Sequence, residues 1–341
     1  MSKRRAPLFV LSAALSVLLL IALFRRIDPG DYGRMLASVH LPSLLAYMAV
    51  NLAGAALRAW RYRILLRPVP VGWGEILTAT LVRNAFVDLL PARIGALSYV
   101  YVLNDRLEKP FGDTASSFAV SFVFDFLTLA PFVLLAAWIV GFSAAGIPAA
   151  ALIAAAAAFF IISALVAWKI AVLVRLGAGL LRSGMKKTAA ARRPSVIRAF
   201  ENLDRAAEAL EKTRKRGAYP SVFLLSLLIR LAKYGSLFFL FFAVLRSQGI
   251  SWEGMSFWKT VLGLTGAELT SALPVKGLAG FGTWESAWAA ALQWMKFDPR
   301  LAVLSGLGIH LITNLFEYGL GLSALGHLAF RRKRDKIARI P

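Results

Sequence analysis

The feature that most constrains this chain is a set of apolar stretches long enough to cross a lipid bilayer. A helix needs about 20 apolar residues to span the hydrocarbon core. Six stretches have about that length: 7–24, 42–66, 115–141, 149–173, 219–246 and 299–329. The first follows a basic start, and no small-residue cleavage pattern comes after it. We interpret it as a retained signal anchor rather than a cleaved signal peptide. We therefore expect an all-α, multi-pass membrane protein with six transmembrane helices.

The composition agrees with a membrane-embedded chain and excludes several soluble classes. Charged residues make up only 17% of the 341 residues, whereas soluble domains contain about 25%. The chain has no cysteine, which excludes disulfides and zinc–thiolate sites. There is no Walker loop, no nucleophile elbow and no soluble catalytic domain. We therefore expect no catalytic residue, no metal and no cofactor, and we expect a transporter rather than an enzyme.

Two further apolar stretches, 76–103 and 257–295, are broken near their middles by proline and glycine. The first break is Leu90-Pro91-Ala92-Arg93-Ile94-Gly95, and the second is Leu273-Pro274-Val275-Lys276-Gly277. Proline cannot continue a regular helix. Irregular backbone at membrane depth is tolerated only inside protein or beside a watery cavity. The pattern predicts two re-entrant helical hairpins.

Lysine and arginine are distributed unevenly between the connecting segments. With a cytoplasmic N-terminus and hairpins that return to their own side, the cytoplasmic segments hold 27 of these residues; they are 1–6, 58–74, 104–114, 174–217 and 331–341. The outer segments hold 5; they are 25–41, 142–148, 247–256 and 296–300. Cytoplasmic loops carry such an excess. If both hairpins crossed fully, the segment 174–217, with 12 of these charges, would lie outside. We therefore place both termini in the cytoplasm and the protein in the cell (inner) membrane.

The basic segment 174–217 also contains apolar residues at helical spacing between 196 and 210. They predict an amphipathic helix, which either lies on the inner leaflet surface or packs on the cytoplasmic ends of the spans. The formal charge of +22 is then mostly a signal of topology. The expected partners are membrane lipids with anionic headgroups, and we expect no nucleic acid.

The two broken hairpins resemble each other, since each has Leu-Pro-x-(Arg/Lys) followed by glycine. Each is preceded by one span and followed by another. In the topology above they come from opposite sides, so the units 42–141 and 219–329 would be inverted copies. Inverted repeats with interrupted helices are typical of transporters, whose site lies where the broken helices meet. Chance similarity of one short motif is the alternative.

Charged residues at membrane depth are costly, and each one is a candidate for function. Arg93 and Lys276 occupy the same place in the two hairpins, where helix N-termini could help them form a phosphate cradle. Glycines in both hairpins would let the backbone approach a ligand closely: Gly95, Gly277, Gly280 and Gly282. Arg230 and Lys233 share one helix face and would extend this cationic path, or would neutralise Asp125 and Glu268.

The acidic groups in these segments are candidates for proton coupling: Asp125, Glu268, Glu285 and Glu317. A site that alternates between an apolar and a cationic surrounding can take up and release a proton. The competing interpretation makes these carboxylates static partners of buried cations. His310, Asn314 and Glu317 share a helix face and would form either a proton relay or interhelical hydrogen bonds.

At these motifs the chain resembles the lysylphosphatidylglycerol synthase transmembrane-region family, whose members are also called flippase-like membrane proteins. The family includes the lipid-flipping half of the multiple peptide resistance factor. The matching residues are Arg58, Arg61, Leu65 and Leu66; Asn84, Pro91, Arg93 and Gly95; Asp125; and Pro274, Gly277, Gly280, Gly282 and Glu285. The resemblance covers about residues 45–325. It departs at Ala96, where the family motif has glutamate, and at Phe122, where arginine often occurs.

This resemblance implies a membrane lipid translocase that moves an aminoacylated phospholipid or a polyprenyl-linked glycolipid between leaflets. It also implies a role for Asn84 in the substrate site. The soluble lysyl-transfer domain is absent, so synthase activity is not implied. The alternative is a membrane enzyme, or a partner subunit of glycolipid or phospholipid assembly, that presents a lipid phosphate to a separate transferase.

Overall fold

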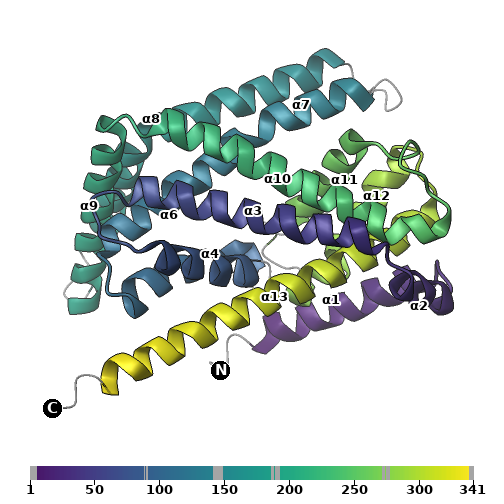
Figure 1. The fold of residues 1–341 in the computed structure, drawn as a ribbon. Coiled ribbons are helices and arrows are strands. Elements are labelled where there is room, and N and C mark those ends of the chain that lie inside the picture. The colour runs from purple at the N-terminus through teal and green to yellow at the C-terminus, as the bar shows by residue number, and fades with distance from the viewer. Residues whose placement is uncertain are drawn as a thin grey trace.

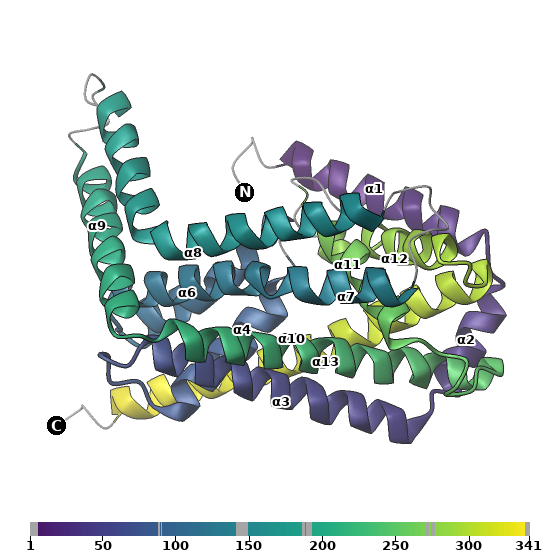
Figure 2. The ribbon, with the colours of Figure 1, turned by 90° about the horizontal axis from the view of Figure 1, so that it is seen from above.

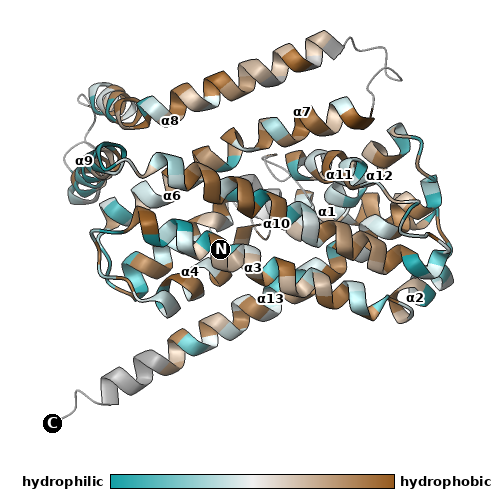
Figure 3. Ribbon diagram, turned by 45° about the horizontal axis from the view of Figure 1, so that its top comes forward, coloured by the Kyte–Doolittle hydropathy of each residue, from teal (hydrophilic) through white to brown (hydrophobic). Residues whose placement is uncertain are grey.

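A computed structural model of the chain describes residues 6–87, 89, 91–140, 149–185, 188, 193–270, 273 and 277–337. Within these residues all regular secondary structure is helical, and most of the long helices run along one direction (Figure 1). Five helices are long and apolar enough to cross a membrane: Leu41–Leu65, Phe111–Val140, Ile153–Met185, Tyr219–Gln248 and Pro299–Phe330. The chain is therefore an all-α, multi-pass membrane protein. Large apolar side chains such as Trp138 and Leu322 lie exposed, where lipid would cover them. Figure 3 shows that hydrophobic residues predominate along the long helices.

The first predicted span forms the helix α1 (Ala6–Phe24). Its apolar part among the residues searched, Leu11–Phe24, is shorter than a spanning helix, so the sixth span stays a prediction. A short helix, α2 (Pro29–Ala37), follows it and was not predicted from the sequence. Its start is capped by Asp28, whose Oδ1 accepts from the Gly30 N–H at 2.7 Å.

The centre of the bundle is a pair of long helices, α3 (Leu41–Leu65) and α10 (Tyr219–Leu245), which lie side by side (Figures 1 and 2). Around them are α6 (Phe111–Leu127), α7 (Leu129–Val140), α8 (Ala149–Met185) and α13 (Pro299–Ile337). The predicted span 115–141 is interrupted at Thr128, between α6 and α7. Pro131, in the first turn of α7, has no N–H to continue the helical ladder, which explains the interruption.

The first broken hairpin comprises α4 (Trp73–Val87), a 3₁₀ segment η1 (Pro91–Leu97), α5 (Ser98–Tyr101) and a π-helical turn η2 (Val102–Arg106). The break falls where proline predicted it, but the return arm is not the regular helix that we expected. A Cβ at Gly95 would lie 1.6 Å from the Phe86 carbonyl oxygen, so only glycine allows this arm to approach α4. The Lys109 ammonium donates to the Pro70 carbonyl oxygen at 2.8 Å, which closes the mouth of the hairpin.

The second broken hairpin comprises α11 (Phe257–Thr270), a short 3₁₀ turn η6 (Leu278–Gly280) and α12 (Thr283–Trp294). Its two arms pack closely, since a Cβ at Gly263 would lie 3.2 Å from the Trp288 ring. A lysine also closes this mouth: Lys259 Nζ donates to the Met295 carbonyl oxygen at 3.2 Å. The helix α1 packs on the tip, where the Ser16 hydroxyl accepts from the Leu278 N–H at 2.7 Å.

The mouths of the two hairpins lie at opposite ends of the bundle. The first lies near α9 (Pro194–Lys215), because a Cβ at Gly112, just after this hairpin, would lie 2.9 Å from Arg205 Cβ. The second lies at the other end of α10, where the rings of Phe257 and Phe238 are 5.7 Å apart. Figure 1 shows α4 and α9 at one end of the bundle and α2, α11 and α12 toward the other. The two tips therefore face each other near the middle.

The basic segment 174–217 is helical over its described part. Figure 2 shows α8 turning sharply near its end, so that its last turns run alongside α9 and across the end of the bundle. Ala207 and Leu210 of α9 are buried against the neighbouring helices α6 and α8. Charged residues join the two helices, with Arg175 bonded to Glu211 at 2.7 Å and Arg182 to Asp204 at 2.5 Å. The helix thus makes the contacts expected of packing on the spans.

Candidate functional site

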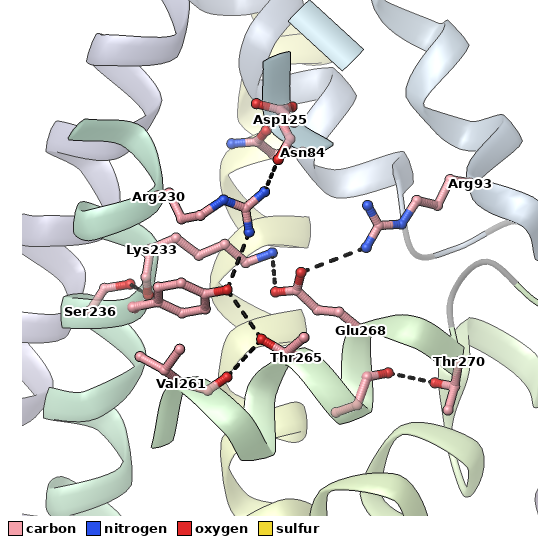
Figure 4. A network of polar contacts seen from close by, with 12 residues as sticks. Asn84, Arg93, Asp125, Arg230, Lys233, Ser236, Val261, Thr265, Glu268 and Thr270 are labelled. Carbon is pink, nitrogen blue, oxygen red and sulfur yellow. Dashed lines mark hydrogen bonds and ion pairs between the residues drawn. The ribbon is translucent and has the colours of Figure 1, made fainter. Parts of the chain in front are cut away.

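A cavity of about 150 Å³ lies at the centre of the bundle, where the two hairpin tips meet. Its walls come from α3, α10 and α13 and from both hairpins. Figure 4 shows that charged side chains from these elements point toward one another here. Elements far apart in the sequence therefore build one polar site inside an apolar bundle.

Glu268, in the last turn of α11, joins the two hairpins to α10. Its Oε1 is 2.5 Å from Lys233 Nζ, and its Oε2 is 3.8 Å from Arg93 Nη2 at the tip of the first hairpin (Figure 4). Arg93 has a φ of 55°, which is rare for a residue with a side chain. The backbone at this tip therefore adopts an uncommon conformation at the point where its side chain reaches Glu268.

Arg230 is held by three separate partners. Its guanidinium donates to the Asp125 carbonyl oxygen, to the Tyr234 hydroxyl at 3.3 Å and to Thr128 Oγ1 at 3.4 Å. The Tyr234 hydroxyl in turn lies 3.2 Å from Thr265 Oγ1 of α11. Arg230 therefore links α10 to the break between α6 and α7, and it lines the cavity as a positioned cation.

Asp125 pairs with Arg61 of α3, with oxygen–nitrogen distances of 2.5 and 3.4 Å. Arg61 also donates to Ser226 Oγ at 2.7 Å, and its side chain is 0% exposed. A bidentate pair in which the arginine is fully buried fixes the position of both helices. The sequence analysis placed Arg58 and Arg61 in a cytoplasmic connection, and this was wrong: both lie within α3, on the side that faces the cavity network.

Two arginines share one amide oxygen beside this pair. Arg58 Nη1 donates to Asn84 Oδ1 at 2.9 Å, and Arg83 Nη1 lies 3.3 Å from the same oxygen. The Nε atoms of Arg58 and Arg83 are buried, and neither has a hydrogen-bond partner among the described residues. An unsatisfied buried N–H costs about 1–3 kcal/mol, so such groups usually have a partner. This is the part of the cavity best suited to an anionic ligand.

Arg58 and Arg83 were not among the residues predicted to bind substrate. The sequence contains a usable signal: Arg58 and Arg61 are three residues apart in a helix that continues to Leu65. That spacing places both on one face, where a membrane helix would need partners for them. Arg83 and Asn84 are adjacent, so periodicity alone could not show that both reach the cavity.

Glu285 and His310 form a second buried pair behind the tip of the second hairpin. His310 Nδ1 is 2.6 Å from Glu285 Oε1, and Glu285 Oε2 accepts from the Gly282 N–H at 2.8 Å. His310 lines the cavity, whereas Glu285 is 0% exposed behind it. Asn51 Nδ2 lies 3.5 Å from Glu317 Oε1, two turns further along the face of α13 that carries His310, so Glu317 and Glu285 have different partners.

The hairpin glycines mostly allow close contact between parts of the protein. A Cβ at Gly277 would lie 1.8 Å from the Phe281 carbonyl oxygen, and one at Gly282 would lie 2.8 Å from Leu19 Cβ of α1. Of the four predicted glycines, Gly280 is the one among the cavity-lining residues, next to His310. Lys276, the proposed counterpart of Arg93, lies outside the described residues.

The cavity wall carries an excess of positive charge among the described residues. Five cationic side chains line it: Arg58, Arg83, Arg93, Arg230 and Lys233. Three carboxylates do so: Asp125, Glu268 and Glu317. With Arg61 behind Asp125 and Glu285 behind His310, six cations surround four carboxylates. In the described part of the chain, no three His, Asp or Glu side chains gather as metal ligands would. The arrangement is suited to an organic or inorganic anion.

Comparison with known proteins assigns the chain to a family. Residues 9–321 match the family model described as the lysylphosphatidylglycerol synthase TM region. The match covers most of the chain, and the protein therefore belongs to this family. No curated protein matches the chain.

Proposed function

From this family membership and the charge of the cavity, we propose that the protein is a membrane lipid translocase. It moves an anionic, phosphate-bearing lipid, such as an aminoacylated phospholipid or a polyprenyl-linked glycolipid, between leaflets. The headgroup occupies the central cavity, and the acyl or prenyl tails stay in the bilayer. The membership itself supports the coarser statement, that this is a membrane protein with a lipid-related role.

The observation that carries the proposal is the pair of arginines at Asn84. Arg58 and Arg83 bring two guanidinium groups to one amide oxygen, and each keeps a buried Nε–H that has no partner in the part of the chain that the structure describes. Guanidinium groups bind phosphate through parallel N–H···O bonds. A phosphate placed there would satisfy these donors and balance the excess of positive charge. Arg93, Arg230 and Lys233 would hold the other oxygens of the headgroup.

The packing of the helices supports two inverted repeats with re-entrant hairpins. The opening spans of the two units, α3 and α10, pack on each other. The first arm of each hairpin packs on the closing span of the other unit: α4 on α13, and α11 on α7. This exchange is what a twofold axis between the units would produce. Each hairpin also returns to the end where it began, through Lys109 and Lys259. Such repeats give alternating access to a central site.

The same packing supports a cytoplasmic location for both termini. The first hairpin mouth and α9 lie at one end of the bundle, and the C-terminal end of α13 points the same way (Figure 1). That end carries most of the lysine and arginine of the connecting segments, as cytoplasmic loops do. We place the protein in the cell (inner) membrane on this basis.

Movement of lipid by the purified protein alone tests the proposal. The protein is reconstituted into vesicles with a trace of fluorescent phosphatidic acid, and transbilayer movement is followed by quenching from outside. Wild type should speed this movement. The double variant Arg58→Gln/Arg83→Gln should lose most of the effect, whereas Lys169→Gln, an exposed cation on α8, should keep it. Equal rates in all three vesicle samples and in protein-free vesicles would contradict a translocase.

The same preparation distinguishes the translocase from the alternative, which is a membrane enzyme or a partner of a separate transferase. Adding a soluble activated donor to the vesicles would yield a modified lipid only if the protein itself catalyses transfer. A product formed without transbilayer movement would support the enzyme and contradict the translocase.

A further inference from the structure

The pair formed by Glu285 and His310 has the features of a proton-binding site. Both side chains are buried, at 0% and 6% exposure, and their Oε1 and Nδ1 atoms are 2.6 Å apart. This contact requires a proton between the two atoms, whichever atom carries it. The second oxygen of Glu285 accepts from the Gly282 N–H at the start of α12, where a carboxylate is also favoured by the helix dipole. Both oxygens of Glu285 are therefore held in place, and the Oε1 contact orients the imidazole.

The other ring nitrogen of His310 faces a different environment. Nδ1 is engaged by Glu285, so Nε2 is the atom that can exchange a proton with the cavity, which His310 lines. The imidazole lies between aromatic rings, 4.6 Å from the ring of Phe281 and 5.0 Å from that of Trp284. A Cβ at Gly280 would lie 3.5 Å from Nε2. The tip of the second hairpin therefore packs against the imidazole and lies close to Nε2, the atom that would take up the proton.

Charged and titratable groups on the surrounding elements complete the electrostatic setting. They are Tyr32 on α2, Arg83 on α4, Arg230 and Lys233 on α10, Glu268 on α11 and Glu317 on α13. The side chains of α1 from Leu11 to Phe24 carry no charge. An anion bound in the cavity would lie among the cations of this set.

We propose that Glu285 and His310 form one proton-binding site, which takes up a proton at His310 Nε2 when the cavity holds an anionic headgroup. Without this proton the pair carries one negative charge, on Glu285. With it the pair is neutral, because the imidazolium balances the carboxylate. The proton comes from solvent that reaches the cavity: an O–H bond of hydronium breaks, leaving water, and an N–H bond forms at Nε2. This inference rests on the proposed function for the identity of the anion, but the proton site itself does not.

Proton uptake and anion binding must then strengthen each other. Protonation removes one negative charge from the cavity wall, so an anionic headgroup binds more tightly. By thermodynamic reciprocity, the bound headgroup raises the affinity of the pair for the proton. Since the bound state holds one more proton, lipid affinity should rise as pH falls, by up to about tenfold per pH unit in the window between the two midpoints. When the headgroup has left the cavity, the affinity of the pair for the proton falls again, and the pair releases the proton.

The stacked Trp284 provides a readout that does not depend on transport. A protonated imidazole quenches the fluorescence of an indole stacked on it. We expect the fluorescence of the purified protein to fall through a one-proton transition between about pH 8 and about pH 5. Trp284→Phe should remove this component because the indole is gone, and His310→Gln should remove it because the titrating group is gone. Glu285→Gln should move the midpoint to lower pH.

A second measurement uses a variant in which Glu285 and His310 are both unchanged. The chain has three histidines, so the variant His40→Gln/His327→Gln keeps His310 as the only one. The imidazole NMR signals of a histidine-labelled sample then report His310 directly, even if His310→Gln does not fold. A single titration in this variant is expected. An imidazole that does not titrate between about pH 5 and about pH 8 would overturn the proton site.

Coupling is tested with two ligands that differ in one phosphate. Dioctanoyl phosphatidic acid should raise the midpoint of the His310 titration, and dioctanoyl glycerol should leave it unchanged. A titration midpoint that neither ligand changes would overturn the coupling. If phosphatidic acid moves the midpoint but no lipid crosses the bilayer at any pH, the proton site and the anion site stand and the translocase proposal fails.

Discussion

Glu268 of α11 and Arg93 of the first hairpin face each other across the centre of the bundle, with Oε2 and Nη2 3.8 Å apart. Among the described residues, this pair makes an electrostatic contact between the two hairpins (Figure 4). Lys233 of α10 holds the other oxygen of Glu268 at 2.5 Å. A headgroup phosphate that binds Arg93 would compete with Glu268 for it. The ligand would therefore change the contact between the hairpins directly.

Replacing Arg93 should weaken lipid binding. Arg93→Ala removes a charged donor at the tip, and hydrogen bonds to charged groups contribute about 1.5–3 kcal/mol. We expect a loss of roughly tenfold or more in affinity for phosphatidic acid, measured with the purified protein. Lys169→Ala is the matched control, because this exposed lysine can reach the membrane interface. Equal small effects of both changes would count against a central site. The same loss is expected for Lys276→Ala.

Replacing Asp125 should destabilise the protein. Asp125→Asn leaves the fully buried Arg61 without its carboxylate, and breaking a buried pair typically costs about 3–5 kcal/mol. Thermal unfolding in detergent measures the loss. The control is Asp204→Asn, whose pair with Arg182 is about half exposed and should contribute no more than about 1 kcal/mol. Normal stability with lost directed transport would instead make Asp125 a proton carrier.

Replacing Gly95 by alanine should disrupt the first hairpin. The new Cβ would lie 1.6 Å from the Phe86 carbonyl oxygen, so the return arm must move away from α4. We expect lower thermal stability and a weaker response to phosphatidic acid. Gly235→Ala, in the interior of α10, is the control because no atom lies within 4 Å of its added Cβ. It should be neutral or stabilising by up to about 1 kcal/mol. Equal behaviour of the two variants would show that the hairpin tolerates a wider separation.

The topology can be tested by labelling single cysteines, since the chain has none of its own. Arg67→Cys lies before the first hairpin and Asp105→Cys lies in its last turn, and both positions are exposed. They should react with a membrane-impermeant reagent from the same side. Glu253→Cys, just before the second hairpin, should react from the other side. Labelling of positions 67 and 105 from opposite sides would show that the first hairpin crosses the membrane.

The spans could be predicted from the sequence because hydrophobicity along the chain reports membrane burial directly. The stretches 42–66 and 219–246 match α3 and α10 to within a residue at each end. Proline marked the two breaks for the same local reason. The irregular return arm of the first hairpin was not predictable, because it follows from the contact of Gly95 with Phe86 rather than from the pattern of its own residues.

The partners within the site could not be predicted in the same way. The sequence analysis identified Asp125 and Glu285 as buried carboxylates, but it paired neither with its main partner. Arg61 and Asp125 are 64 positions apart, and only packing decides which cation reaches which carboxylate. Arg58 was assigned to a loop because the charge itself suggested the end of a span. Where a charge lies inside an apolar helix, the stronger expectation is a partner in the core.

The most direct test of the central claim is whether the cavity distinguishes a lipid with a phosphate from the same lipid without one. Binding of dioctanoyl phosphatidic acid and of dioctanoyl glycerol is measured by native mass spectrometry on wild type and on Arg58→Gln/Arg83→Gln. We predict that wild type prefers the phosphate-bearing lipid by about tenfold or more, and that the double variant loses this preference while still binding the uncharged lipid. Equal binding of both lipids by wild type, or an unchanged preference in the variant, would contradict an anion site at these arginines.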